Sequence, residues 1–212
     1  MTVRSAFLAV AVDARALIAD PEVARQWHEP SALREMTTGH LAGHLARGVF
    51  TVEQYLGAPA PTGTATVTPG AYFVEGAKLT DDMHDELNTQ IRQRSRAESQ
   101  GGHGDLVMRL DQSIGRVTAA LSEEEHDRLV AVFGGTLMTL DDYLVARLVE
   151  LVIHIDDLAV SVAVETPSVV EEARALVVDC LVEMARRAHG DLAVIRAMAR
   201  RERGSPDALH VF

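Results

Sequence analysis

The stretch that decides the fold is DDYLVARLVELVIHIDDLAVSV, residues 141–162, the most apolar part of the chain. It runs for more than 20 residues without Gly or Pro, which favours a buried helix, although the β-branched cluster in residues 151–155 also permits a strand. The two acids at its start agree with a helix, because negative side chains stabilise a helix N-terminus. We therefore predict a buried helix over this stretch.

Glu150 and His154 lie four positions apart inside this apolar element. Both need partners in a buried helix, because an unpaired buried carboxylate is costly. Four helical residues rise about 6 Å and turn only about 40° past a full turn, so both side chains can reach one ion. In a strand the pair would lie about 13 Å apart. The helix prediction therefore allows the two residues to share a metal.

A second pair with the same spacing, His40 and His44, lies in GHLAGHLARG, residues 39–48. The surrounding pattern predicts a helix from residue 37 or 38 to about residue 56. Taken alone, either pair on a helix is more often a local hydrogen bond than a metal site. The two pairs therefore become informative only in combination.

His44, Glu150 and His154 together offer three nitrogen and oxygen ligands from two helices. Three such ligands with an open position are typical of a catalytic zinc site. A set of two histidines and one carboxylate also suits iron and related divalent metals. The spacing therefore predicts a divalent-metal site and leaves the identity of the metal open.

Composition limits the class of protein. The chain has 212 residues, enough for a sizeable core, and we expect residues 1–212 to form a single domain. Aromatic residues make up only 4% of the chain, and the abundance of Ala, Val and Leu favours packed helices. The net charge of −11 argues against a nucleic-acid groove and a polybasic membrane patch.

Cysteine usage points to the cellular compartment. Cys180 is the only cysteine, which excludes a disulfide or a multi-thiolate zinc motif within one chain and fits a reducing cytoplasm. Cys180 also lies on an apolar stripe, so we expect it in the core and not as a nucleophile. No segment is long and apolar enough to cross a membrane. We therefore expect a cytoplasmic protein with no membrane and no nucleic-acid partner.

Apolar periodicity predicts the remaining elements. The Pro-, Gly- and Thr-rich residues 57–73 are interpreted as part of a long crossover with room for a short extended piece. Residues 122–125, SEEE, have the pattern of a capping box and predict the start of another short helix. Residues 131–140, AVFGGTLMTL, fit either a brief strand or coil. The predicted helices cover about residues 3–19, 80–98 (capped by Thr80), 105–121, 168–188 and 191–200, with a short one that begins at Pro21 behind an Asp20 cap. The fold class is thus all-α and mainly helical, a bundle with a long crossover and additional short helices.

Two long motifs resemble a known family. SALREMTTGHLAGHLARGVFTVEQYL, residues 31–56, and MTLDDYLVARLVELVIHIDDLAVSV, residues 138–162, are similar to the metal-binding domain of mycothiol-dependent maleylpyruvate isomerases. That family belongs to the wider DinB-like group of four-helix bundles. Residues 189–212 resemble the ending of its short members, so the resemblance covers nearly the whole chain. It implies that the predicted bundle is a DinB-like four-helix bundle.

The resemblance also implies a site and a chemistry. The first metal histidine of the family, in its HLA motif, falls on His44, and the Glu and His of its E-L-x-x-H motif fall on Glu150 and His154. A divalent metal, usually zinc, would then bind these residues, with mycothiol as the thiol cosubstrate at the open position. The implied partners are this thiol and a small electrophilic substrate, in an isomerase or an S-transferase, and a homodimer is an option.

The sequence does not identify the substrate. The characterised isomerases have an additional C-terminal domain, whereas this sequence ends at Phe212, and this difference puts maleylpyruvate itself in doubt more than the metal. A bundle that binds metal without turnover and a metal-dependent hydrolase remain as alternatives.

Three neighbouring residues are candidates for supporting roles. His40 is outside the family pattern, and we favour a place on the groove wall or behind a ligand over a role as fourth ligand. Asp157, three residues past His154, has the spacing to orient that imidazole, with a solvated or capping role as the alternative. Arg147 is expected to pair with Glu150 or, alternatively, with an anionic substrate.

Overall fold

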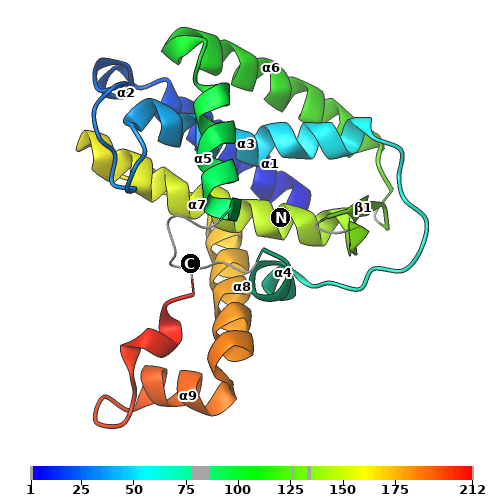
Figure 1. The fold of residues 1–212 in the computed structure, drawn as a ribbon. Coiled ribbons are helices and arrows are strands. Elements are labelled where there is room, and N and C mark those ends of the chain that lie inside the picture. The colour runs from blue at the N-terminus through cyan, green and yellow to red at the C-terminus, as the bar shows by residue number, and fades with distance from the viewer. Residues whose placement is uncertain (1, 78–85, 126, 133–134, 212) are drawn as a thin grey trace.

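Helix α7 (Leu140–Val162) is the element against which much of the molecule packs. It contacts α1 (Val3–Ile18) and α3 (Thr38–Gly57), and both of these contact α6 (Gly102–Glu123), so the four helices form a closed bundle (Figure 1). The computed structural model describes residues 2–77, 86–125, 127–132 and 135–211. The predicted all-α fold is confirmed.

Local sequence signals explain where the first helices begin. The Thr2 side chain accepts a hydrogen bond from the backbone N–H of Ser5 and thereby caps α1, as expected for an N-cap hydroxyl. Asp20 accepts from the N–H of Glu22 and caps the short α2 (Pro21–Arg25), whose first residue is proline. Both elements agree with the predicted helices.

The predicted crossover follows α3. It contains a single helical turn, α4 (Pro69–Ala71), which continues into a π-helical turn, η1 (Tyr72–Ala77). The backbone N–H of Thr66 donates to the carbonyl oxygen of Leu137, which ties the crossover to a distant segment. Helix α5 (Glu86–Glu98) comes next, whereas the predicted start of that helix at Thr80 lies outside the described residues.

The region after α6 differs from the prediction. The predicted capping box at residues 122–125 is wrong, because α6 continues to Glu123 and the Ser122 hydroxyl donates to the carbonyl oxygen of Ala119 within that helix. The strand alternative for the next segment is correct. Strands β1 (Leu129–Ala131) and β2 (Leu137–Thr139) pair antiparallel, with Val130 opposite Met138. Both of these side chains are buried, so the hairpin closes one end of the core.

The C-terminal helices extend from the bundle. Helix α8 (Glu171–His189) packs on α7 and ends at Gly190, whose φ of 83° is a left-handed conformation that glycine adopts without strain. Helix α9 (Asp191–Ala199) and the 3₁₀ turn η3 (Pro206–Leu209) pack against the far part of α8 (Figure 1). Cys180 on α8 is buried, as predicted. None of the helices in the described ranges has both the length and the apolar character to cross a membrane.

A close helix contact at Gly43 gives a first test of the packing. A Cβ added to Gly43 would lie 2.5 Å from the carbonyl oxygen of Ser95 on α5, and backbone atoms cannot move aside cheaply. We expect Gly43→Ala to lower the free energy of unfolding by about 1–3 kcal/mol, as overpacking usually does. Gly115→Ala is the matched control, because that helical glycine has nothing within 4 Å and alanine there should stabilise by about 0.5–1 kcal/mol. Urea denaturation of both variants measures the difference, and equal stabilisation by both would contradict it.

Candidate metal centre

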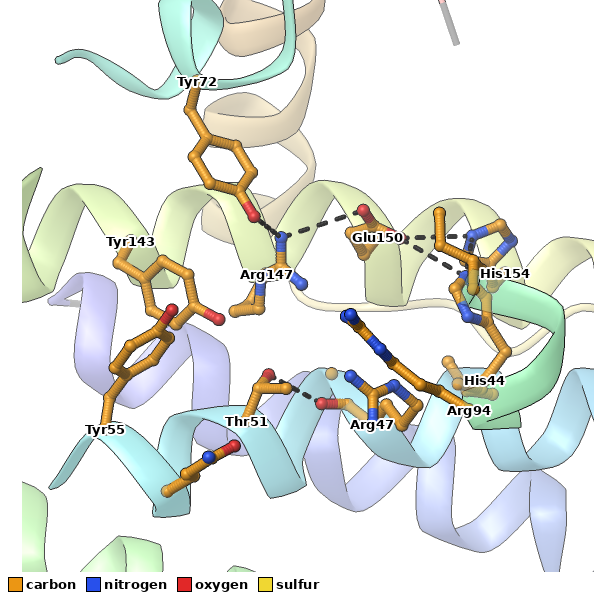
Figure 2. Close-up of a pocket in the computed structure, with 14 residues that line it drawn as sticks. His44, Arg47, Thr51, Tyr55, Tyr72, Arg94, Tyr143, Arg147, Glu150 and His154 are labelled. Atoms are coloured by element: carbon orange, nitrogen blue, oxygen red, sulfur yellow. Dashed lines mark hydrogen bonds and ion pairs between the residues drawn. The ribbon is translucent and has the colours of Figure 1, made fainter. Parts of the chain in front are cut away.

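His44 on α3 and the pair Glu150 and His154 on α7 meet at one wall of a cavity (Figure 2). The His44 Nε2 atom lies 3.1 Å from the His154 Nε2 atom. A carboxylate oxygen of Glu150 lies 3.6 Å from the first of these nitrogens and 3.3 Å from the second. The structure thus brings together the three residues that the sequence selected as candidate ligands.

These three distances fit a tetrahedral metal. Zinc binds imidazole nitrogen and carboxylate oxygen at about 2.0–2.2 Å, so neighbouring ligand atoms at tetrahedral angles lie about 3.3 Å apart. The three edges of the triangle are 3.1, 3.3 and 3.6 Å, which bracket that value. The donor set and its spacing therefore fit a divalent cation and leave one face of the triangle open to the cavity.

The local sequence produces this arrangement in two ways. Glu150 and His154 share one face of α7 because they are four residues apart. Gly48 lies one turn after His44 on α3, and a Cβ there would come within 2.7 Å of the Leu151 side chain. A glycine at this position lets α3 approach α7 closely, so that the His44 imidazole reaches the other two side chains.

Each imidazole has a polar partner on its outer nitrogen. The Nδ1 atom of His154 lies 2.8 Å from a carboxylate oxygen of Asp157, to which it donates its proton. The Nδ1 atom of His44 lies 3.2 Å from the hydroxyl oxygen of Ser95 on α5. A partner on Nδ1 fixes the orientation of a histidine and turns Nε2 toward a shared centre. Asp157 was a candidate from the sequence, whereas Ser95 was missed.

The pKa values of His44, Glu150 and His154 depend on one another, because the three side chains are close together and largely buried. Burial lowers the pKa of His154, but hydrogen bonds with Asp157 and Glu150 outweigh burial and raise that pKa to about 9. Burial and the neighbouring His154 lower the pKa of His44. Burial alone would raise the pKa of Glu150, yet the hydrogen bond with His154 and the charges of Arg147 and His154 hold it well below its usual range. A cation, either a proton or a metal, therefore suits the space between the two Nε2 atoms.

Arg147 lies beside Glu150, as predicted, with 3.8 Å between the guanidinium and the carboxylate. One of its N–H groups donates to the hydroxyl of Tyr72 at 3.1 Å. The guanidinium carbon also lies 5.5 Å from the centre of the Tyr72 ring and 5.0 Å from that of Tyr143. The two rings hold Arg147 in place through cation–π contacts, and its buried Nε atom has no hydrogen-bond partner in the described part of the chain.

The cavity in front of these residues has a volume of about 230 Å³. Its lining includes three arginines but, among the described residues, a single carboxylate, that of Glu150. Arg94 on α5 and Arg47 on α3 both extend into this region (Figure 2). The Arg47 guanidinium also lies 3.6 Å from the carboxylate of Glu98, which is outside the lining. Burial raises the pKa of Tyr72, so its phenol stays protonated at neutral pH. The full lining is His44, Leu45, Arg47, Gly48, Thr51, Gln54, Tyr55, Tyr72, Ile91, Arg94, Tyr143, Arg147, Glu150 and His154.

The structure places His40 away from this group. Its Nδ1 atom lies 3.4 Å from the backbone nitrogen of Thr37 in the N-terminal cap of α3, and its side chain lines a different cavity beside Trp27 and Arg96. The expected place on the wall of the metal groove therefore differs from the observed one. The physical reason is that the first turn of α3 is hydrogen-bonded to the Trp27 segment through the N–H of Gly39, whereas His44, one turn later, contacts α7.

Comparison with known protein families identifies the family of the chain. The sequence profile of the mycothiol maleylpyruvate isomerase N-terminal domain matches residues 7–159, which run from α1 through most of α7 and include all three candidate ligands. Neither the curated proteins nor the solved structures compared with the chain gave a significant match. The matched segment covers more than half of the chain and has the helical fold expected of a DinB-like domain. The chain therefore belongs to the mycothiol maleylpyruvate isomerase N-terminal domain family.

Proposed function

We propose that the protein binds one divalent metal, most simply zinc, through His44, Glu150 and His154, and that it is an enzyme that uses a low-molecular-weight thiol to isomerise or S-conjugate a small electrophile. The triangle of Nε2 and carboxylate oxygen atoms beside an open cavity is the observation that carries this proposal. A metal bound there would hold the sulfur of a thiol in its deprotonated form near neutral pH. Family membership favours mycothiol as that thiol.

The chain has no reactive thiol of its own. Cys180, its only cysteine, lies buried on α8, and burial raises the pKa of its thiol to about 12. A thiolate is the nucleophilic form of cysteine, so this residue is inert at neutral pH. Any sulfur nucleophile must therefore enter the cavity as a separate small molecule. A reducing cytoplasm, which keeps such thiols reduced, is the location we propose.

The lining of the cavity supports an electrophile that carries a negative charge. In the described part of the lining, Arg47, Arg94 and Arg147 contribute three positive charges against the carboxylate of Glu150, although the whole chain has a net charge of −11. A cationic cavity in an acidic protein concentrates small anions at the site. Guanidinium groups bind carboxylates through paired, charge-assisted hydrogen bonds. We propose that Arg94, which is exposed on α5, receives the substrate and that the fixed guanidinium of Arg147 orients it.

The test is a turnover assay of zinc-loaded protein with mycothiol and two electrophiles, one with a carboxylate and one uncharged. We expect thiol-dependent turnover of both. Arg94→Gln should raise KM about tenfold for the anion, the loss of roughly one charge-assisted hydrogen bond, and leave the neutral compound unchanged. Arg96→Gln, two residues further along α5 on the other cavity, is the matched control. Equal effects of Arg94→Gln on both electrophiles would contradict the charge argument.

The alternatives give different outcomes in the same assay. A metal-dependent hydrolase would turn over an ester or amide without any thiol, because water would take the open position. A binding module would retain zinc and bind thiol with no turnover of either electrophile. Thiol dependence therefore separates the proposed enzyme from both.

A further inference from the structure

Ser95 is a fully buried hydroxyl at the contact between α3 and α5. Its Oγ atom lies 2.7 Å from the carbonyl oxygen of Ile91 in its own helix and 3.2 Å from the Nδ1 atom of His44. The hydroxyl reaches His44 because Gly43 has no side chain, and a Cβ there would meet the Ser95 carbonyl oxygen at 2.5 Å. Ser95 thus contacts both a helix carbonyl and a candidate metal ligand.

The positions of the hydrogens follow from counting donors. A serine hydroxyl has one hydrogen to donate, and a carbonyl oxygen can only accept. The two oxygens, 2.7 Å apart, would repel each other without a hydrogen between them, so the Ser95 hydrogen points to Ile91. The Ser95 oxygen can then only accept from His44. The His44 Nδ1 atom must therefore carry the hydrogen of the neutral imidazole.

This tautomer leaves the Nε2 atom of His44 without a hydrogen. That nitrogen lies 3.1 Å from His154 Nε2, so its lone pair faces the centre of the candidate site. The opposite tautomer would place an N–H there and would exclude a metal. On His154 the Nδ1 hydrogen is held by Asp157, so the proton that a metal would displace from this residue is the one on Nε2. The Nδ1 atoms of the two histidines thus have partners on different helices: the Ser95 hydroxyl on α5 for His44 and the Asp157 carboxylate on α7 for His154.

We propose that Ser95 is a positioning residue of the metal centre: it selects the metal-binding tautomer of His44, and α5 is thereby the third helix that builds the site. The inference rests on the proposed metal binding. It goes beyond the three ligands, because it gives a function to a residue that touches neither metal nor substrate. Removal of such an outer partner typically lowers metal affinity about 10- to 100-fold.

The experiment compares Ser95→Ala with Ser99→Ala. Ser99 is the matched control, because it lies four residues after Ser95, is also buried, and its hydroxyl donates to the carbonyl oxygen of Arg96. Zinc affinity is measured by competition with a chromogenic chelator. Imidazole ¹⁵N NMR of the metal-free proteins reports which nitrogen of His44 carries the hydrogen, and thermal unfolding checks that both variants fold.

We expect wild-type protein and Ser99→Ala to show His44 protonated at Nδ1 and to bind zinc equally. Ser95→Ala should show a shift of the hydrogen toward Nε2 and bind zinc about tenfold more weakly or worse. An unchanged tautomer with unchanged affinity in Ser95→Ala would overturn the inference, as would equal losses in both serine variants. If wild-type protein itself retains no zinc, the proposed function fails, whereas the tautomer measurement still decides whether Ser95 controls His44.

Discussion

Purified His154→Ala protein will retain less than about a tenth of an equivalent of zinc, whereas wild-type protein will retain about one. The substitution removes one of three ligands, and the remaining pair, His44 and Glu150, is too few for a stable protein site. Elemental analysis of untagged protein after desalting gives the result directly. A full equivalent of zinc in the variant would refute the ligand set.

His40→Ala is the matched control for this experiment, because it removes an imidazole that lies on α3, one turn before His44, and lines another cavity. It should retain zinc as the wild type does. Metal-free His154→Ala should also lose stability at neutral pH, because Glu150 then loses the cationic partner at 3.3 Å and is left, among the described residues, with the cation of Arg147 at 3.8 Å. Breaking a buried pair costs about 3–5 kcal/mol, and the remaining arginine favours the lower end.

Zinc affinity will rise about 50-fold between pH 7 and pH 9 and level off at about 100 times its value at pH 7. The pKa of His154 is raised to about 9 in the metal-free protein, so below that pH zinc must displace one proton from this residue. Affinity therefore increases about tenfold for each pH unit up to the pKa. Glu150 adds no further proton, because its pKa is well below its usual range. Zinc titrations in buffers of different ionisation enthalpy should show release of about one proton at pH 7.5.

The same raised pKa has the opposite consequence for stability without metal. The folded state holds the His154 proton more tightly than the unfolded state, whose pKa is near 6.5. This stabilisation is complete below about pH 6.5 and is lost as the pH rises through about 9.

Asp157→Asn removes one cause of the raised pKa of His154, so the pH at which zinc affinity levels off should be lower in this variant. A flat affinity profile in the wild type would contradict the assignment of the proton.

The elements that the sequence predicted best are those with local causes. Helix α7 follows from an uninterrupted apolar run with acids at its start, and α2 follows from Asp20 and Pro21. The capping-box prediction at Ser122 failed because the apolar face of α6 continues through Leu121, and packing of that residue extends the helix past the local signal. Local pattern decides an element only when tertiary contacts do not override it.

The residues of the candidate site show the same difference between local and tertiary causes. Glu150 and His154 could be paired from helix spacing alone, whereas their link to His44 depends on a contact between helices that spacing does not encode. Ser95 and Arg94 could not be predicted at all, because α5 returns to α3 only through the long crossover. Their signal in the sequence is indirect: Gly43, a glycine inside an amphipathic helix, indicates that another backbone passes close by.

The separation of the candidate ligands along the chain affects how the protein is made. His44 and His154 are 110 residues apart. A ribosome adds about 5–20 residues per second, so roughly 5–20 s pass between synthesis of the first histidine and the second. During that time the nascent chain holds an isolated imidazole with no carboxylate partner. Capture of the proposed metal would therefore be a late event in biogenesis, after both helices that carry the ligands have been made.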